Sequence, residues 1–326
     1  PGMEVVRGLH NLRPRHRGCV ATLGNFDGVH LGHQVVIGQL AEKAQELRLP
    51  TLAMIFEPQP LEYFRPPPVP ARLTRLREKL MALRRYSVDR VLIVRFDQTF
   101  AAMTAEDFID RVLVEKLGVR YLVVGDDFRF GRERRGDFAM LAAAGQRHGF
   151  PVVNVHTYAV DGERVSSTRV RDRLAAGDLA GAERLLGRPY RMSGRVAHGD
   201  KLGRRLGIPT ANIHLHRRET PIRGVFVVEL FGIDGEPWPG VASIGTRPTV
   251  NGTRVLLEVH LLDFDRDLYG AHVHVNFLHK LREEKRFDSI DEMVRRIHDD
   301  IAQARDFFHR RDRDPSAPAS EAGRRR

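Results

Sequence analysis

Short apolar runs alternate with amphipathic stretches along the first half of the chain. The apolar runs cover residues 19–23, 51–56, 91–96, 121–125 and 151–158. Apolar residues recur at helical spacing in the stretches 34–49, 75–86, 104–117 and 137–148. Near-continuous apolar runs are typical of strands that are buried on both faces of a parallel sheet. The alternation therefore predicts an open α/β sheet with right-handed crossovers.

The pattern changes near residue 187. Two short helical patterns at 168–176 and 178–186 end at residues 187–189, and strand-like segments follow. These segments cover residues 190–197, 222–233, 241–245, 254–264 and 271–279, before a last helical pattern at 289–309. This order predicts a mostly antiparallel β domain that is closed by a C-terminal helix. We expect domains at 1–187 and 188–310, followed by a charged, disordered tail at 311–326.

Composition narrows the class of protein. A chain of 326 residues with 42% hydrophobic and 29% charged residues suits a soluble protein of two domains. No apolar run approaches the roughly 18–20 residues that are needed to span a bilayer. The single cysteine, Cys19, excludes an intramolecular disulfide framework and is typical of a cytoplasmic protein. The net charge of +11 favours anionic partners, either nucleic acid or a phosphorylated small molecule.

The sequence GNFDGVHLGH at 24–33 is the first candidate for chemistry. It follows the first strand-like run of the α/β pattern and precedes the first clear helix, where open α/β sheets bind ligands. Its glycines allow a phosphate to approach the backbone, and the helix start offers unpaired N–H groups. If the helix begins near Val29, His30 and His33 share one face and can bind phosphate oxygens. The alternatives are a metal site, for which no third ligand is evident, or two ordinary histidines at a helix start.

Several motifs resemble those of one enzyme family. The HxGH element resembles the signature of the nucleotidyltransferase superfamily, whose members transfer AMP or CMP to a phosphate acceptor. The chain also resembles the N-terminal module of the prokaryotic bifunctional riboflavin kinase/FAD synthetases. The segments that carry this resemblance are FEPQP (56–60), LTRLREKL (73–80), GDDFRFG (125–131) and SSTRVR (166–171). Those that resemble the C-terminal flavokinase module are 187–212, 243–250, 257–270 and 281–289.

This resemblance implies a fold, two activities and a set of partners. The fold would be an N-terminal Rossmann-like nucleotidyltransferase domain and a C-terminal antiparallel β-barrel flavokinase domain with a closing helix. The C-terminal module would phosphorylate riboflavin to FMN with ATP, and the N-terminal module would adenylylate FMN to FAD with a second ATP, releasing pyrophosphate. Mg²⁺ is the implied cofactor, with riboflavin, FMN and ATP as partners and no specific nucleic acid or membrane. We expect a monomer with two separate sites.

In the adenylyl-transfer site, the resemblance implies that His30 and His33 contact the phosphates of ATP as catalytic groups. The other positions that it implies for ATP binding are Gly24, Asn25, Phe26, Asp27, Gly32, Ser166, Ser167, Thr168 and Arg171. Those that it implies for flavin binding are Phe56, Pro58, Asp127, Phe128 and Phe130. The plainer interpretations are core packing for the phenylalanines and helix capping for the hydroxyl groups of 166–168. Gln59 stands where some relatives carry histidine, which argues against a catalytic base at this position.

In the kinase site, Thr210 and Asn212 lie two residues apart, so an extended chain points both side chains the same way. Their oxygen atoms suit a hard cation such as Mg²⁺. The resemblance implies that Thr210 and Asn212 help to bind Mg-ATP, near the metal and the phosphates. Its other nucleotide-binding positions are Gly199, Gly203, Gly207 and Pro209. The plainer interpretation is a glycine-rich turn in which Thr and Asn make ordinary hydrogen bonds.

Glu258 lies in an apolar strand-like run, where a carboxylate is costly without a partner or a function. The resemblance implies a general base that takes the proton of the riboflavin 5′-hydroxyl, and an ion pair with an arginine is the alternative. Arg247 would contact the flavin or its phosphate, with a solvated loop arginine as the alternative. His272 and His274 form an HxH pair without an evident third metal ligand, so we expect a structural role for both.

Two other functions are compatible with parts of this pattern. The first is an HxGH adenylyltransferase for a different acceptor, with a β domain that has no catalytic role. This alternative gives no role to the candidate kinase residues of the β domain, which are Thr210, Asn212 and Glu258. The second is a basic nucleic-acid-binding protein, which the net charge permits, although the sequence shows no exposed-aromatic recognition motif or zinc module.

Overall fold

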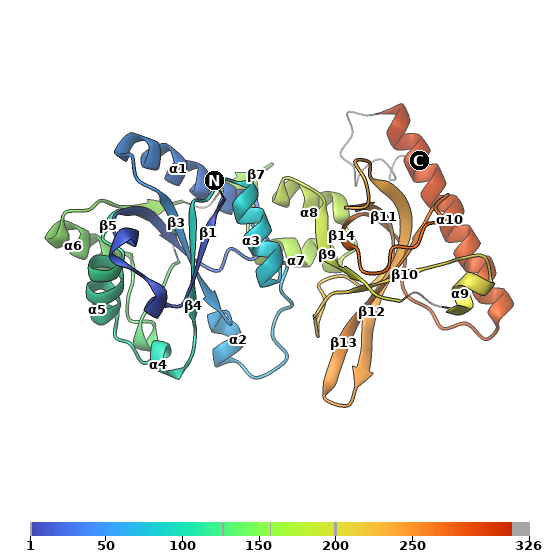
Figure 1. Cartoon of the computed structure of the whole chain (residues 1–326), viewed down its shortest axis with the longest axis horizontal. Coiled ribbons are helices and arrows are strands. Elements are labelled where there is room, and N and C mark those ends of the chain that lie inside the picture. Colours follow the sequence, from blue (N-terminus) through green and yellow to red (C-terminus); the bar gives the residue numbers. More distant parts are fainter. Residues whose placement is uncertain (1, 126, 157, 199–200, 315–326) are drawn as a thin grey trace. The chain divides into compact units, whose positions relative to one another are not determined.

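The computed structural model describes residues 2–125, 127–156, 158–198 and 201–314 (Figure 1). The chain forms two compact units. The first contains Pro1–Pro70 and Thr74–Val165, and the second contains Ala71–Leu73 and Ser166–Arg326. The boundary predicted between residues 187 and 188 stays a prediction. Within the described ranges, every helix is too short or too polar to span a lipid bilayer.

A parallel six-stranded sheet forms the centre of the first unit. Its strands, in spatial order, are β1 (Glu4–Arg7), β4 (Arg90–Arg95), β3 (Thr51–Glu57), β2 (Cys19–Leu23), β5 (Val119–Gly125) and β6 (Val152–Val155). All pairings between these neighbours are parallel. Every residue of β2 is buried, which explains why its sequence carries no charged side chain. The predicted α/β sheet is therefore confirmed.

Helices pack on both faces of this sheet. Successive residues of β3 point to opposite faces, so Ala53 and Ile55 share a core with Leu83, whereas Met54 shares a core with Ile109. The first core includes residues of α1 (Leu31–Leu47) and α3 (Leu76–Arg85). The second includes residues of α5 (Ala105–Asp107), the π-helix η3 (Phe108–Lys116) and α6 (Phe138–His148).

Shorter elements complete the first unit. They are η1 (Leu9–Asn11), η2 (Pro14–His16), α2 (Pro60–Phe64), α4 (Gln98–Ala101), η4 (Arg132–Arg134) and the hairpin of β7 (Ala159–Val160) and β8 (Glu163–Arg164). The predicted strands and helices of this unit are present, although the strand expected over 151–158 is shorter, because β6 ends at Val155. The sequence pattern does not predict β1, α2, α4 or the hairpin of β7 and β8, and the helix expected over 104–117 is divided into α5 and η3.

The second unit is a closed barrel of antiparallel strands, which confirms the predicted β-barrel. The strands, in spatial order, are β10 (Ala211–His214), β13 (Gly252–Leu261), β12 (Trp238–Thr249), β11 (Gly224–Phe231), β14 (His272–Arg282) and β9 (Tyr190–Val196), and β9 closes onto β10. The helices are α7 (Ser167–Ala175), α8 (Leu179–Leu186), α9 (Lys201–Arg205) and α10 (Ile290–Arg313). The sequence reading missed β10 because its residues follow a glycine-rich segment.

Helix α10 packs along the outside of the barrel (Figure 1). Ala304 and Phe307 share a core with Val225, Val227 and Leu278 of the barrel strands. The helix ends at Arg313, so the prediction of a disordered tail from residue 311 is wrong for residues 311–313, which continue the amphipathic helix. Residues 315–326 of that predicted tail lie outside the described residues.

Candidate active sites

The order of strands in the parallel sheet identifies its ligand-binding edge. From β2 the chain crosses to β3 on one side, whereas β5 pairs with β2 on the other side. Crevices form where crossovers diverge in this way, at the carboxyl ends of the strands. Residues 24–33 follow β2, and the segment that begins at Asp127 follows β5. Two of the sequence-predicted segments therefore emerge from neighbouring strands at the same edge.

His30 and His33 lie face to face at the start of α1. Their ring centroids are 3.5 Å apart with an angle of 15° between the planes. The backbone N–H of His33 donates to Nδ1 of His30 at 3.3 Å, and the N–H of His30 donates to Nδ1 of His33 at 3.2 Å. His30 is the N-cap of α1, so these bonds also satisfy helix-start donors. The predicted proximity of the two imidazoles is confirmed.

The turn before α1 has an unusual backbone. Phe26, Gly28 and Val29 all have positive φ angles, of 53°, 88° and 43°. The buried carboxylate of Asp27 holds the turn by accepting hydrogen bonds from the backbone N–H and hydroxyl of Thr74, at 3.0 and 3.3 Å. The Thr74 hydroxyl in turn accepts the N–H of Gly28. Strained backbone of this kind is retained where the surrounding contacts enforce it, often at functional sites.

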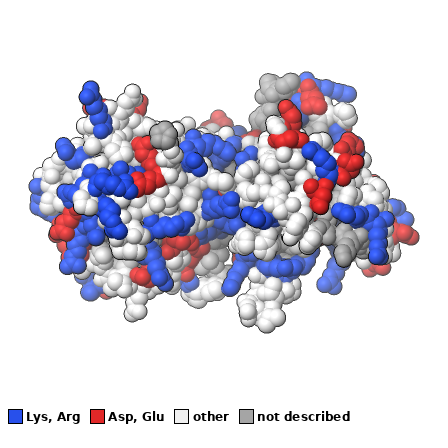
Figure 2. Space-filling view, in the orientation of Figure 1, with Lys and Arg blue, Asp and Glu red and all other residues white. Residues whose placement is uncertain are grey.

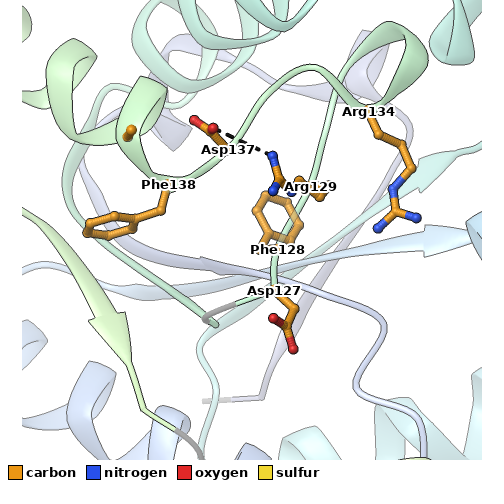
Figure 3. Close-up of a pocket in the computed structure, with 7 residues that line it drawn as sticks. Asp127, Phe128, Arg129, Arg134, Asp137 and Phe138 are labelled. Carbon is orange, nitrogen blue, oxygen red and sulfur yellow. Dashed lines mark ion pairs between the residues drawn. The ribbon is translucent and has the colours of Figure 1, made fainter.

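A hollow of about 400 Å³ opens beyond the end of β5 (Figure 3). Its lining residues are Asp127, Phe128, Arg129, Arg134, Asp137, Phe138 and Ala139. Phe128 stacks on Phe130, with ring centroids 5.7 Å apart and planes inclined by 16°. Phe130 belongs to the buried core, whereas Phe128 is only half-buried and lines the hollow. One of the two predicted aromatic positions is thus a core residue, and the other faces a space that a ligand could occupy.

The other positions predicted for flavin binding lie in and after β3. Phe56 is buried in the core against Phe96 and Phe100. Pro58 follows a cis peptide bond at the end of β3. Gln59 is the N-cap of α2 and is buried. None of these three residues lines the hollow of Figure 3 among its described residues.

The predicted hydroxyl and arginine positions of residues 166–171 belong to the second unit. Ser166 is the N-cap of α7, and its hydroxyl accepts the N–H of Arg169 at 3.1 Å. Capping was the plainer interpretation of these hydroxyl groups, and this bond fits it. Arg171 donates through Nε to the carbonyl of Ala71 at 2.7 Å. A phosphate-binding role for Ser166, Ser167, Thr168 and Arg171 stays a prediction.

A second, larger hollow of about 560 Å³ lies at the barrel. Thr210, Arg247 and Glu258, all predicted from the sequence, line it together. The strand register places Glu258 beside polar residues of both neighbouring strands. Glu258 on β13 lies directly opposite Asn212 on β10 and opposite Ser243 on β12. A carboxylate that the sequence marks as costly in an apolar strand therefore lines a hollow together with other charged and polar side chains.

Thr210 and Asn212 have oxygen atoms that fit a cation. Oγ1 of Thr210 and Oδ1 of Asn212 are buried and have no hydrogen-bond partner among the described residues. The amide of Asn212 is fixed, because its Nδ2 donates to the carbonyl of His198 at 2.7 Å. Buried polar atoms are rarely left without a partner, so two such oxygens beside a carboxylate fit the coordination of a cation. This donor set suits Mg²⁺, which prefers oxygen ligands.

The glycine positions predicted for nucleotide binding lie before β10. Gly199 lies outside the described residues. Gly203 is within α9, and Gly207 follows it with a φ of 77°. The carbonyl of Pro209 accepts a hydrogen bond from Nδ1 of His260 at 2.8 Å, which ties this segment to β13. His260 also lines the hollow.

Glu284, which lines the barrel hollow, is not among the residues predicted from the sequence. Its carboxylate accepts the hydroxyl of Ser243 at 3.0 Å and lies 3.6 Å from the guanidinium of Arg247. Ser243 and Glu284 are 41 residues apart, so no local pattern signals their contact. The buried pair of Arg282 and Asp300, at 2.8 Å, also lines this hollow.

The HxH pair on β14 is held by protein contacts. Nδ1 of His274 shares a hydrogen bond of 2.6 Å with the hydroxyl of Ser193 on β9. The rings of His272 and His274 are 5.4 Å apart and nearly perpendicular. Among the described residues, no cluster of three or more His, Cys, Asp or Glu side chains is arranged to hold a metal ion.

Comparisons with known proteins identify the family. Residues 12–169 match the family described as FAD synthetase, and residues 186–308 match the family described as riboflavin kinase. Over 307 residues, the chain is 53% identical to the bifunctional riboflavin kinase/FMN adenylyltransferase of Escherichia coli strain K12, which covers 94% of this chain and 98% of the relative. The chain belongs to the bifunctional riboflavin kinase/FMN adenylyltransferase family.

A second relative carries the same family name, and a solved structure has the same fold. The bifunctional riboflavin kinase/FMN adenylyltransferase of Pseudomonas fluorescens is 55% identical over 304 residues, which cover 93% of this chain and 97% of the relative. A crystal structure described as a macrolide-efflux protein from Streptococcus pneumoniae has a TM-score of 0.80 and 29% identity, covering 93% of this chain and 99% of that one. The description as a macrolide-efflux protein belongs to the Streptococcus pneumoniae structure alone. This chain shares the fold of that structure.

Proposed function

We propose that this chain makes FMN and then FAD: the barrel phosphorylates riboflavin with ATP, and the parallel-sheet unit adenylylates FMN with ATP. The single observation that carries the proposal is the position of Glu258. It lines the barrel hollow and lies opposite Asn212, whose buried oxygen fits Mg²⁺. A base beside a metal-nucleotide site is the arrangement that a kinase for a hydroxyl acceptor needs.

In the kinase reaction, Glu258 takes the proton from the 5′-hydroxyl of riboflavin while that oxygen attacks the γ-phosphorus of ATP and ADP leaves. Thr210 and Asn212 would hold Mg²⁺, which neutralises phosphate charge when it is bound. Gly199, Gly203, Gly207 and Pro209 would contact the nucleotide. Arg247 would contact the flavin or its phosphate.

In the adenylyl-transfer reaction, a phosphate oxygen of FMN attacks the α-phosphorus of ATP, and pyrophosphate leaves. Nδ1 of each imidazole accepts a backbone N–H, so the proton of each neutral ring stays on Nε2. His30 and His33 therefore present two N–H donors from one stacked pair. Such donors stabilise the negative charge that develops at phosphorus, and the start of α1 adds its positive dipole end.

The remaining predicted residues of this site have supporting roles in the proposal. Gly24, Asn25, Phe26, Asp27 and Gly32 would shape the loop around ATP. Its phosphates would be bound by Ser166, Ser167, Thr168 and Arg171. Phe56, Pro58, Asp127, Phe128 and Phe130 would form the flavin side. The expectation of a cytoplasmic monomer also stays a prediction.

A chromatographic assay tests the two activities together. The protein is incubated with riboflavin, ATP and Mg²⁺, and riboflavin, FMN and FAD are resolved over time. We expect the wild type to form FMN and then FAD. The double variant His30→Ala with His33→Ala should stop at FMN, whereas Glu258→Ala should form almost no FMN and still convert supplied FMN to FAD. An unchanged rate of FAD formation in the histidine variant would reject the role of the imidazoles.

The alternatives give different results. An adenylyltransferase for another acceptor would form no FMN from riboflavin. A nucleic-acid-binding protein would bind mixed oligonucleotides with a steep salt dependence. On the face seen in Figure 2, Lys and Arg side chains are spread among Asp and Glu rather than gathered in one continuous patch. This distribution gives no support to a nucleic-acid surface there.

A further inference from the structure

Two arginines and two aspartates line the hollow beyond β5, and Arg134 is the one of these four whose charge is not paired with another described residue. Arg129 lies 3.5 Å from Asp137, and Arg164 donates to Asp127 at 3.2 Å. Arg134 lines the same hollow but makes no ion pair or side-chain hydrogen bond with any described residue. Figure 3 shows Arg134 apart from the pair formed by Arg129 and Asp137. A negative group on a ligand would balance this remaining charge.

The loop that carries Arg134 is built to hold it in place. Phe130 and Gly136 close the base of the loop with two backbone hydrogen bonds, of 3.2 and 2.8 Å. Gly136 faces the Phe130 ring so closely that a Cβ atom would lie 2.5 Å from it. A side chain at this position would therefore force the loop apart.

The tip of the loop is anchored as well. The N–H of Arg132 donates to the carbonyl of Met103 at 2.8 Å, and a Cβ atom on Gly131 would lie 2.7 Å from the backbone of Ala105. Glu133 and Arg134 both adopt left-handed backbone, with φ angles of 59° and 55°. Two consecutive residues in this region are costly, and such strain is retained where the fold enforces it. Arg134 is therefore presented to the hollow by an anchored turn.

The hollow suits a planar aromatic ligand with an anionic group. Phe128 and Phe138 supply aromatic surface on its lining, and its volume of about 400 Å³ is within the usual range for small-molecule sites. The edge of the sheet that holds it is also the edge that carries the stacked histidines, because β2 and β5 are neighbours. A ligand held here by its ring could extend its anionic end toward the adenylyl-transfer chemistry.

We propose that Arg134 binds the phosphate of FMN and makes the adenylyl-transfer site select phosphorylated over unphosphorylated flavin. This inference rests on the function proposed for the first unit. A guanidinium group can grip two phosphate oxygens at once, and the anchored loop lowers the entropy lost on binding. Riboflavin has the same ring without the phosphate, so it would leave Arg134 without a counter-charge.

The test compares two flavins in the Arg134→Gln variant. The KM for FMN is measured in FAD formation, and lumiflavin, which has the ring without the ribityl phosphate, is used as a competitive inhibitor. We expect the KM for FMN to rise about tenfold to a hundredfold, the usual effect of losing hydrogen bonds to a charged group. The inhibition constant of lumiflavin should stay unchanged. Arg134→Lys should recover part of the FMN affinity, because it keeps the charge and loses the planar fork.

Arg135→Gln is the matched control, because Arg135 lies on the same loop but pairs with Glu133 at 2.7 Å. It should leave both constants unchanged. The proposal would be overturned if Arg134→Gln weakened the binding of FMN and of lumiflavin equally, or if it weakened the binding of neither. If the wild type forms no FAD, the proposed function fails instead. Titration of flavin fluorescence then gives the affinities of the wild type and of Arg134→Gln for FMN and for lumiflavin. If the difference between the two affinities is the same in both proteins, the role of Arg134 is rejected.

Discussion

Gly32 illustrates how a missing side chain shapes the adenylyl-transfer site. A Cβ atom at this position would lie 3.0 Å from Cε1 and 3.1 Å from Nδ1 of His30. These contacts are tighter than ordinary van der Waals packing, so the imidazole would have to move. The glycine between the two histidines therefore makes room for the stacked pair, in addition to any contact with a phosphate.

We predict that Gly32→Ala lowers the rate of FAD formation from FMN by about tenfold, less than the roughly hundredfold loss for an ångström of misplacement, because His30 has to shift by only a few tenths of an ångström. Phosphorylation of riboflavin should be unchanged. Gly38→Ala is the control, because it lies in the same helix with no atom within 4 Å of an added Cβ. That variant should keep full activity and gain roughly 0.5–1 kcal/mol in free energy of unfolding. Unchanged FAD formation in Gly32→Ala would show that His30 can shift without loss.

Gly245 makes room for the side chain of Glu284 in the barrel hollow, as Gly32 makes room for the imidazole of His30. An added Cβ there would overlap the carboxylate of Glu284, which holds Ser243 and Arg247. We predict that Gly245→Ala displaces Glu284 and lowers kcat/KM for riboflavin phosphorylation by about tenfold, the effect of losing one charged hydrogen bond. Glu284→Gln should give a similar loss.

The displaced group is the end of a flexible side chain, so the melting temperature of Gly245→Ala should change little. FAD formation from supplied FMN should also be unaffected. Gly235→Ala has no atom within 4 Å of the added Cβ and serves as the control for kinase kinetics. Full kinase activity in both Gly245→Ala and Glu284→Gln would show that the contacts of Glu284 do not position Arg247.

At the level of elements, the sequence pattern predicts those strands, helices and contacts that depend on the spacing of nearby residues. The strands β2, β3, β4 and β5 are buried on both faces, and their apolar runs identify them. The division of the predicted helix 104–117 into α5 and η3 could not be predicted, because apolar spacing alone does not distinguish a π-helix from an α-helix. The adjacency of His30 and His33 follows from their spacing of three residues. The contact of Glu284 with Ser243 depends on barrel closure, which the sequence does not specify locally.

A partly buried ion pair ties the end of α10 to the barrel. Arg311 donates to Glu229 on β11 through both terminal nitrogens, and this bond raises the pKa of Arg311. We predict that Arg311→Ala lowers the free energy of unfolding by about 3 kcal/mol, because it leaves the buried Glu229 carboxylate without its partner. Thermal denaturation measures the change. Arg305→Ala is the matched control on the same helix, since its pair with Asp263 is exposed to solvent and should contribute little. Equal losses in the two variants would contradict the prediction.

At the scale of the whole molecule, each unit carries its own spectroscopic or chemical reporter. Cys19, the single cysteine, lies on β2 of the first unit and is fully buried. Burial raises the pKa of its thiol to about 12, so almost no thiolate forms at pH 8 in the folded state. Trp238, the single tryptophan, lies on β12 of the second unit. Labelling of Cys19 therefore reports unfolding of the first unit, and tryptophan fluorescence reports the second.

We predict that the two units unfold separately in urea, because each has its own hydrophobic core. Cys19 should react with a thiol reagent only at urea concentrations that unfold the parallel sheet. Arg311→Ala should lower the midpoint of the Trp238 transition and leave the Cys19 midpoint unchanged, because the lost ion pair belongs to the second unit. A Cys19→Ala control identifies the labelled site. If both midpoints fall together in Arg311→Ala, the two units unfold as one cooperative structure, and an assay of either activity would then report the stability of both.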